Sequence, residues 1–399
     1  IIDVKVITNS NISSSGNVGT SVITTYSAAA ISADLSTITP LGNAVSVQTI
    51  TSNIAADFDQ YGNAMNQVVS SQYFDTAQNK LLFSSYQVIT LNTYDIHNRL
   101  LTSTVDNYSD TGTAFTSREL IANSNYDVYG NALNQTVNTY QSKTATTANL
   151  VNSRVIVNSY TDPVTLVYNT AAAYFHHTVT STVSRYNTDV TADQQGYSHM
   201  IDRTYTYSKS FDNLGNALVQ SEDKSVASQG SLVQTTHMDI TNADYNNRGD
   251  SRTQYIATYQ VDGATNTLVN YQVFTNRSYD SSHQVLNQMV LTYADPGKLV
   301  TNYSDQSQLD KALLLDCKEI RSSGFTPSGV ASSQRVITYS DYDVVNHVGT
   351  NLIGVKVIDN TLFSGITNTG TRVIANYSTV TFQDGDTTKD ITDYSGKLD

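Results

Sequence analysis

The feature that most constrains this chain is a phrase that recurs from one end to the other. Its clearest copy runs from Arg118 to Tyr140, RELIANSNYDVYGNALNQTVNTY. The copy has a partly alternating polar and apolar segment, an aromatic residue followed by Asp127, a turn at Gly130 and Asn131, and a second alternating segment. Alternation that is rich in Val, Ile, Thr and Tyr is typical of strands. The phrase therefore predicts a β-hairpin that is repeated along the chain.

The residues between the two segments predict the hairpin turn. An Asp carboxylate can accept a backbone N–H two residues further on, and Gly and Asn tolerate the positive φ of such turns. Calcium needs several oxygens at one site, whereas these aspartates occur once per turn. We interpret them as turn caps, with calcium ligation as the alternative. The predicted turn positions are Asp59, Asp95, Asp127, Asp212, Asp280 and Asp343, Gly62, Gly130 and Gly215, and Asn63, Asn131 and Asn216.

An aromatic residue precedes each predicted turn. With Tyr160 counted as a further member, neighbouring aromatics in the regular part are 32 to 36 residues apart, except between Tyr160 and Phe211. If the hairpins stack side by side, the rings fall on one row, where neighbouring rings contribute roughly 0.5 to 1.5 kcal/mol per pair. The sequence thus predicts an aromatic ladder of Phe58, Tyr94, Tyr126, Phe211, Tyr245, Tyr279 and Tyr342.

Two stretches depart from the repeat. The pattern is blurred between residues 160 and 211, where the extra length could hold an additional hairpin. The segment SQLDKALLLDCKEI, residues 307–320, is the one stretch of helical composition, and helix and strand both stay open for it.

The composition favours an all-β fold. Acidic residues are nearly all Asp, which favours turns, while Glu, which favours helices, occurs only at Glu119, Glu222 and Glu319. We predict a tandem array of antiparallel β-hairpins of about 34 residues each, forming an elongated, spiralling or solenoid-like sheet. Abundant aromatic and β-branched residues argue against disorder.

Charge and hydropathy exclude two classes of partner. A net charge of −13 argues against binding nucleic acid, which requires a basic face. The chain contains no run of 18 apolar residues, so no membrane span is predicted. The chain begins with Ile1 and shows no signal-like apolar segment, which indicates a removed leader or a window from a longer chain.

A long period lies above the short one. Residues 352–378 repeat residues 1–27 at an offset of 351 without gaps, and fourteen of the 27 positions are identical. We interpret residues 1–351 as one long period of tandem hairpins and residues 352–399 as the start of the next copy. The chain is then either part of a longer tandem protein, which we favour, or a discrete subunit with equivalent segments at both ends. Both versions predict a fibre.

Several turns resemble a known repeat. YDVYGNAL (126–133), YDIHNRLL (94–101), DPGKL (295–299) and DYSGKL (393–398) are similar to the YD repeat of the RHS family, whose core is Tyr-Asp-x-x-Gly-Arg-Leu. The resemblance implies serial hairpins in a long spiralling sheet of a large secreted or surface protein. Some members of that family form shells around toxins. Here the unit is longer than usual, and Asn often replaces Arg.

No residue pattern points to a reaction. His176 and His177 are adjacent and would face opposite sides of a strand, so they could not share a metal. The other histidines lack paired-ligand spacing, and no serine lies in G-x-S-x-G. The single cysteine, Cys317, cannot form an internal disulfide, and we interpret it as a small buried hydrophobe. We therefore predict no enzyme activity, no metal and no cofactor.

The leading prediction is a non-enzymatic, extracellular or cell-surface structural protein. Its hairpin units would continue edge to edge into a filament, tube or surface fibre, so its partner would be itself or the next part of a longer chain. The alternatives are an adhesin whose Tyr-rich face binds cell-surface glycans, part of an RHS-type toxin-encapsulating shell, and a polysaccharide-cleaving enzyme of the β-helix type.

Overall fold

The strands follow one another in a single antiparallel sheet. The computed structural model describes residues 4–32, 38–75, 80–188, 197–246, 249–279, 283–294, 314–325, 330–343, 346–364, 368–383 and 391–398. Within these ranges each strand pairs with the strand before it and the strand after it in the chain, except that β1 pairs only with β2 and β21 only with β20. The all-β hairpin array predicted from the sequence is therefore confirmed.

The strands of the first part of the sheet are β1 (Val4–Ile12), β2 (Val18–Ile31), β3 (Ile38–Thr51), β4 (Gln67–Asp75), β5 (Lys80–Tyr94), β6 (Leu100–Tyr108), β7 (Phe115–Tyr126), β8 (Ala132–Tyr140), β9 (Leu150–Ser159) and β10 (Thr180–Tyr186). The second part contains β11 (Met200–Phe211), β12 (Ala217–Ser228), β13 (Ser231–Tyr245), β14 (Ser251–Asp262), β15 (Thr265–Tyr279), β16 (Val285–Tyr293), β17 (Leu314–Phe325), β18 (Ala331–Asp343), β19 (Val348–Ser364), β20 (Asn368–Phe382) and β21 (Ile391–Leu398). The helical elements are α1 (Thr170–Tyr174) and the short 3₁₀ helix η1 (Thr147–Asn149).

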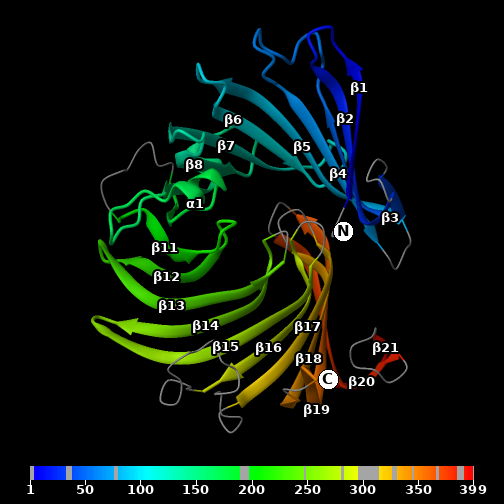
Figure 1. Ribbon diagram of the computed structural model, residues 1–399, viewed down its shortest axis with the longest axis vertical. Helices are drawn as coiled ribbons and strands as arrows, with labels where there is room; N and C mark the ends of the chain where they lie inside the picture. The colour runs from blue at the N-terminus through cyan, green and yellow to red at the C-terminus, as the bar shows by residue number, and fades with distance from the viewer. Residues whose placement is uncertain are drawn as a thin grey trace.

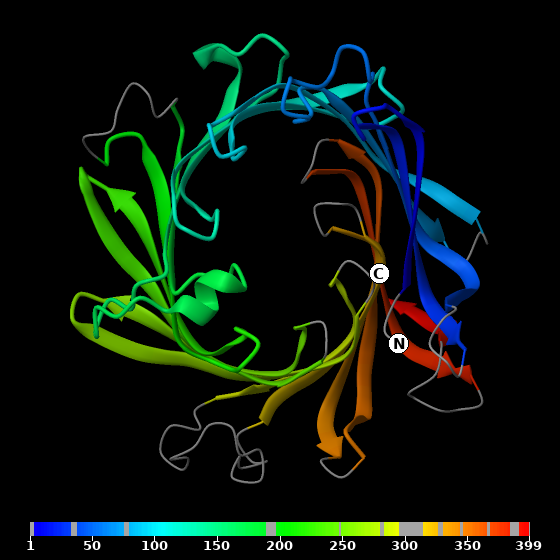
Figure 2. The same cartoon turned by 45° about the horizontal axis from the view of Figure 1, so that its top comes forward.

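The sheet curls around until its later strands lie beside its earlier ones (Figures 1 and 2). Strand β17 comes into contact with β4. A Cβ placed on Gly324 would lie 3.8 Å from Cε2 of Tyr73. Right-handed strand twist accumulates from strand to strand, which bends a long sheet away from a plane. The array is thus a curled, spiralling sheet rather than a flat slab.

The meander gives the sheet two distinct rims. In an antiparallel meander, every loop that follows an odd-numbered strand lies on one rim, which we call the turn rim, and the other loops lie on the opposite rim. On the turn rim, except at the insertion between β9 and β10, the last residue before the loop pairs with the residue six positions later. These pairs are Ile12 with Val18, Phe58 with Ala64, Tyr94 with Leu100, Tyr126 with Ala132, Phe211 with Ala217, Tyr245 with Ser251, Tyr279 with Val285, Phe325 with Ala331 and Phe363 with Thr369.

This arrangement corrects the position predicted for Tyr342. Tyr342 is the second-last residue of β18, an even-numbered strand, so the loop that follows lies on the opposite rim and the residue does not belong to the row of turn aromatics. Its side chain is buried, and its hydroxyl lies 3.1 Å from Nδ1 of His347. Phe325 occupies the aromatic position of that unit on the turn rim. Phe325 lies further from Tyr279 than the 32 to 36 residues that separate the regular turn aromatics, so the spacing did not identify Phe325 as a turn aromatic.

The structure decides between the alternatives left open for the two irregular stretches. Among the described residues between 160 and 211 there is one hairpin, β10–β11, and part of the extra length forms an insertion with α1 between β9 and β10. Of residues 307–320, those from Leu314 onward are strand and the earlier ones lie outside the described ranges. Pairing with both β16 and β18 overrides the helical composition.

The largest core cluster lies where β14 to β19 bring apolar side chains together. It includes Met289, Cys317, Ile337, Val355 and Val357. Cys317 is fully buried, with its Sγ 3.3 Å from Sδ of Met289. A smaller cluster packs around the insertion that contains α1.

Candidate functional site: the turn rim

Each regular turn is closed by its own Asp carboxylate. In the turn that follows Tyr126, Oδ1 of Asp127 accepts the backbone N–H groups of Tyr129 at 2.9 Å and Asn131 at 2.8 Å. Oδ2 accepts the side-chain amide of Asn131 at 2.7 Å. Gly130 has a φ of 83°, a left-handed conformation that glycine adopts without strain. Outside the turn, Oδ2 also accepts the hydroxyl of Tyr168 at 3.1 Å, so both carboxylate oxygens are hydrogen-bonded within the chain.

The same bonds recur along the rim with small substitutions. Asp59 and Asp212 bind Asn63 and Asn216 in the same way, and Gly62 and Gly215 also have positive φ. Asp280 lies outside the described residues. On the opposite rim, Asp343 accepts the backbone N–H of Asn346 at 3.1 Å and its side-chain amide at 2.7 Å.

One turn exchanges the two roles. Asn246 stands at the Asp position and Asp250 at the Asn position, and the amide of Asn246 donates to Oδ2 of Asp250 at 2.8 Å. The backbone N–H of Asp250 donates to Oδ1 of Asn246 at 3.1 Å. The turn therefore requires one donor and one acceptor across it, in either order.

The turn closest to the YD core carries Arg. Asp95 accepts Nε of Arg99 at 2.7 Å, and the guanidinium of Arg99 also lies 4.7 Å from the ring centre of Tyr126 in the next turn. A cation over an aromatic face is attracted by the ring quadrupole. Asn at this position can satisfy the carboxylate, but it cannot reach the next ring.

These bonds hold the carboxylates in the charged form. The side chain of Arg99 lowers the pKa of Asp95 to about 2. The side-chain amide of Asn63 lowers the pKa of Asp59. Burial raises the pKa of Asp127, but the bonds from Asn131 and its neighbours outweigh burial, so its net shift is downward.

Acid is expected to weaken the turn at Asp95. Because its folded pKa is depressed, the stability it contributes is present above the unfolded pKa of about 3.9 and is lost as the pH falls toward the folded value of about 2. Between about pH 5 and pH 2.5, the urea midpoint of the wild type should fall by more than that of Asp95→Asn, whose side chain does not titrate. Equal falls would contradict this role of Asp95.

The tyrosines before the turns act mainly through their hydroxyl groups. The hydroxyl of Tyr94 donates to the backbone oxygen of Ala64 at 2.8 Å, and that of Tyr126 donates to the backbone oxygen of Leu100. Tyr245 and Tyr279 donate in the same way to Ala217 and Ser251. Each acceptor is the residue just after the preceding turn on the rim. The hydroxyls therefore fasten each hairpin to the one before it.

The expected stacking of turn aromatics is replaced by this hydroxyl contact. Ring-to-ring contacts among the described residues join other aromatics, such as Tyr86 with Tyr108 and Tyr108 with Phe115, both at 5.8 Å between centroids. Adjacent hairpin units are two strands apart, about 9.6 Å, which is too far for neighbouring rings to touch. Burial raises the pKa of Tyr245 to about 12, so its hydroxyl keeps its proton at neutral pH.

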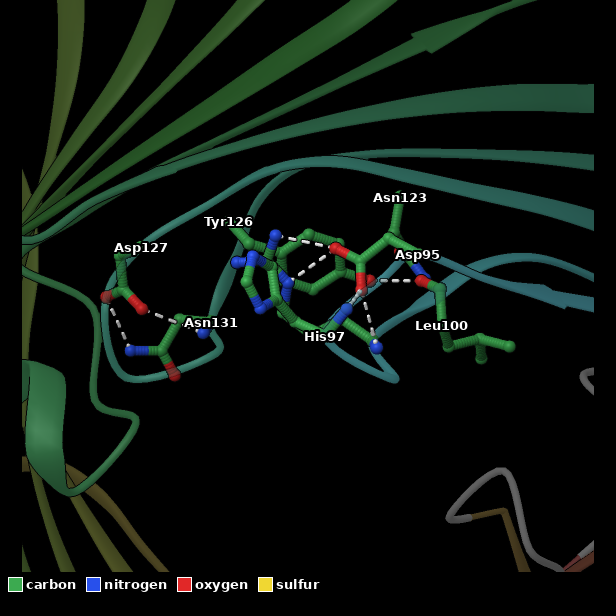
Figure 3. Close-up of polar contacts among 8 residues, drawn as sticks. Asp95, His97, Leu100, Asn123, Tyr126, Asp127 and Asn131 are labelled. Carbon is green, nitrogen blue, oxygen red and sulfur yellow. Dashed lines mark hydrogen bonds and ion pairs between the residues drawn. The ribbon is translucent and has the colours of Figure 1, made fainter. Parts of the chain in front are cut away.

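An asparagine three residues before the aromatic reinforces the same carbonyl. Nδ2 of Asn123 donates to the oxygen of Leu100 at 3.1 Å, beside the hydroxyl of Tyr126 (Figure 3). The oxygen of the same amide accepts Nε2 of Gln135 at 2.8 Å. Asn242 with Gln254 and Asn276 with Gln288 repeat this arrangement. The full motif is thus N-x-x-Y-D-x-x-G-N-x-x-x-Q, in which the first Asn and the Gln were not singled out from the sequence.

Neighbouring turns also touch one another directly along the rim. The amide of Asn63 donates to Oδ1 of Asn98 in the next turn at 3.0 Å. Asp250 contacts Nδ1 of His283 in the same relation. Where the facing residue is glycine, as at Gly249, a Cβ would lie only 2.8 Å from Oδ1 of Asn216. At this turn position, a polar side chain such as Asn98 or His283 bonds to the neighbouring turn, and glycine is found where the neighbouring side chain lies too close for a Cβ.

His176 and His177 lie in the insertion after α1, and each contacts a different turn. Nδ1 of His176 contacts Oδ1 of Asn131, whose amide also donates to the oxygen of Ala173 at 2.9 Å. Nδ1 of His177 contacts the backbone oxygen of Gly215. The insertion therefore bridges the turns on either side of it, and the two imidazoles point to different groups.

An open cavity lies on the turn rim beside this insertion. It has a volume of about 270 Å³, and His177, Phe211, Gln220 and Tyr245 are among the residues that line it. Two of its polar groups are already bonded: Nε2 of Gln220 donates to Ser208 at 3.0 Å, and the hydroxyl of Tyr245 donates to Ala217.

Metal-binding clusters and membrane-spanning helices are both absent from the described ranges. No three His, Cys, Asp or Glu side chains there come together as metal ligands would. The helices in that part of the chain, α1 and η1, are five and three residues long, far too short to cross a bilayer.

Comparisons with known proteins identify no family. No family model matches the chain, and no curated protein does. Among solved structures it is similar to the crystal structure of TcdB2-TccC3 without its hypervariable C-terminal region, with 10% identity over 98% of this chain and a TM-score of 0.18. For the structure of TcdB2-TccC3-TEV the identity is 9% over 93% of this chain, with a TM-score of 0.20. The chain spans 20% and 18% of the lengths of those two proteins.

Proposed function

We propose that this chain is a non-enzymatic, extracellular structural protein whose curled sheet continues from one copy of the sequence to the next and builds the wall of a filament or tube. The observation that supports this most is the relation between the two ends of the sheet. All eight residue pairs that join β1 to β2 reappear between β19 and β20 at the offset of 351 residues. The long period of the sequence is therefore also a period of the pairing.

The side chains of the turn rim support a structural role. The aspartates take hydrogen bonds from their own turns, and the tyrosine and asparagine side chains fasten each hairpin to the one before. Such nearest-neighbour bonding lets a repeat array extend by adding units. Among the described strands, β1 and β21 each have a single neighbour, which leaves backbone donors and acceptors available for further pairing.

The proposal predicts assembly that depends on the β1 edge. At rising concentration the purified chain should form elongated particles, seen by negative-stain microscopy and as a growing sedimentation coefficient. Val6→Asp places a charge on the edge strand and should shift assembly to at least about tenfold higher concentration, since a charge on an edge blocks further pairing. Val157→Asp is the matched control, because Val157 is 45% exposed, against 37% for Val6, and is paired on both sides, with Asn134 of β8 and Thr182 of β10. Isolated particles at all concentrations would contradict the proposal.

The curl of the sheet favours a second candidate, a wall that encloses a cargo. The approach of β17 to β4 shows that the sheet turns back on itself within one chain (Figure 2). A shell of the kind known in the RHS family needs this curvature. Cryo-electron microscopy separates the two candidates: closed particles with density inside support a shell, and open-ended assemblies support a filament.

Exposed tyrosines on the turn rim favour a third candidate, glycan binding. Tyr61 is 72% exposed at the tip of its turn, and Tyr129 and Tyr174 form an edge-to-face pair with centroids 6.2 Å apart. Exposed aromatic rings can stack on the apolar faces of sugars. A glycan array tests this directly, and Tyr61→Ala should reduce any signal that depends on the rim.

A further inference from the structure

We propose that the outer edge of β1 binds a strand with the sequence of β18, Ala331–Asp343, supplied by another copy of this sequence period. The bound strand is antiparallel to β1 and takes the register in which β18 pairs with β19. This inference rests on the proposed function and specifies the partner strand and its alignment, which the general idea of edge-to-edge growth leaves open.

The first step is that β1 and residues 355–363 of β19 are equivalent strands at the offset of 351 residues, and we call them twins. Val4 pairs with Tyr26 and Val355 pairs with Tyr377, and the later pairs continue in step. The two strands share the run Val-Lys-Val-Ile. On its other side β19 is covered by β18, whereas β1 has no second neighbour among the described strands. In their pairing, the twins differ in this missing strand.

The second step is that equivalent side chains are buried in β19 and exposed in β1. Val357 is 7% exposed and belongs to the large core cluster, together with Ile337 of β18. Its twin Val6 is 37% exposed, and Ile7 is 60% exposed where its twin Ile358 is half-buried. Leaving apolar area in water costs about 25 cal/mol per Å². The face of β1 thus carries the residues of a covered strand without the cover.

The third step is that β18 offers what β1 lacks. Ile337 lies opposite Val355, and Val336 lies opposite Lys356, so at β1 they would lie opposite Val4 and Lys5. Nδ2 of Asn360 donates to the backbone oxygen of Ala331 at 2.8 Å. The twin of Asn360 is Asn9, which is exposed on β1.

One contact of the β18–β19 pair is not reproduced. Asp359 accepts bonds from Ser333 at 2.8 Å and from Arg335 at 2.9 Å, but its twin on β1 is Thr8. Backbone pairing, the apolar face and Asn9 would therefore hold the strand, and binding should depend little on salt.

The free edge of β21 is a less suitable partner. β21 pairs with β20 as β3 pairs with β2, so β21 occupies the place of β3 in the long period. The strand that follows β3 is β4, not β1. A pairing of β1 with β21 therefore has no counterpart in the chain, while the pairing of β1 with a β18 strand has one.

The test uses the full chain and a synthetic peptide with the sequence of β18. Lys5→Cys and Ile7→Cys are made separately in the protein, and Val336→Cys and Gln334→Cys separately in the peptide. The peptide thiol is activated as a mixed disulfide with thionitrobenzoate. The protein thiolate attacks the peptide sulfur, a protein–peptide disulfide forms, and thionitrobenzoate leaves as a coloured thiolate. The unsubstituted protein, whose Cys317 is buried, serves as the blank.

The proposed register predicts which of the four combinations react. Val336→Cys should cross-link to Lys5→Cys, and Gln334→Cys to Ile7→Cys, because these positions correspond to directly opposed pairs of β18 and β19. The two crossed combinations are shifted by two residues, about 6.6 Å, on the same face of the strand. They should react at least about tenfold more slowly, since a disulfide needs Cα atoms within about 7 Å. Equal rates in all four, or no reaction above the blank, would overturn the inference.

The outcome is separable from that of the proposed function. Filaments without register-specific cross-linking would leave the filament proposal standing and remove this edge as its contact. Register-specific cross-linking by a protein that never forms elongated particles would establish the binding edge and remove the filament. A scrambled peptide that reacts as fast as the β18 peptide would also overturn the inference.

Discussion

Replacing Asn276 by Leu is expected to lower the local free energy of unfolding by about 2 to 4 kcal/mol, because the buried oxygen of Ser251 loses one of its two donors and the half-buried amide of Gln288 loses its acceptor. Asn276 is 3% exposed and donates to the backbone oxygen of Ser251 at 2.9 Å. Its own oxygen accepts Nε2 of Gln288 at 2.6 Å. Leucine fills the space but satisfies neither group. Hydrogen exchange of the amides in β14 to β16 measures the loss.

A second asparagine on the same strand provides the control. Asn266 is exposed on β15, and Asn266→Leu should change the local stability by no more than about 0.5 kcal/mol. Tyr279→Phe keeps the ring but removes the hydroxyl that shares the Ser251 oxygen, and about 1 kcal/mol should be lost. If Asn276→Leu were as mild as Asn266→Leu, the Asn–Gln contacts would be incidental to the fold.

The other large effect is expected from Ile337→Ala. Ile337 is fully buried in the cluster formed by β14 to β19. Removing its side chain leaves a cavity, and buried Ile-to-Ala changes cost about 2 to 5 kcal/mol. Because each strand of a repeat array contacts mainly its neighbours, the weakening should be concentrated around β18 and should spare β5 to β8.

Hydrogen exchange resolved by peptide measures this loss, and it should accelerate in β17 to β19 and remain unchanged in β5 to β8. Ile353→Ala is the matched control, since Ile353 lies on β19 but is 58% exposed. Uniform acceleration over the whole sheet would instead mean that the array unfolds as one cooperative unit.

The repeated turn shows how far local sequence can lead. Asp127, Gly130 and Asn131 contact one another within five residues, so residue type and spacing alone predicted their bonds. The roles of Asn123 and Tyr126 could not be predicted in the same way, because their common acceptor, Leu100, lies more than twenty residues away on another hairpin. Only the strand register brings these three residues together.

The structure of two other segments also depends on residues that are distant in the sequence. Residues from Leu314 onward have helical composition but form a strand, since β16 and β18 offer hydrogen-bond partners on both sides. Tyr342 has the sequence of a turn aromatic but lies near the end of β18, an even-numbered strand, so its loop is on the opposite rim. Counting strands along the meander, rather than residues between motifs, assigns each loop to its rim.

The sequence by itself determined the hairpin unit, its turn chemistry and the long period of 351 residues, because these depend on side chains close together in the chain or on identity between two segments. The tertiary structure decided the curl of the sheet, the rim on which each loop lies and the contrast between the buried β19 and the exposed β1. These properties depend on twist summed over many strands and on which strand happens to have a neighbour, and no single stretch of residues encodes either.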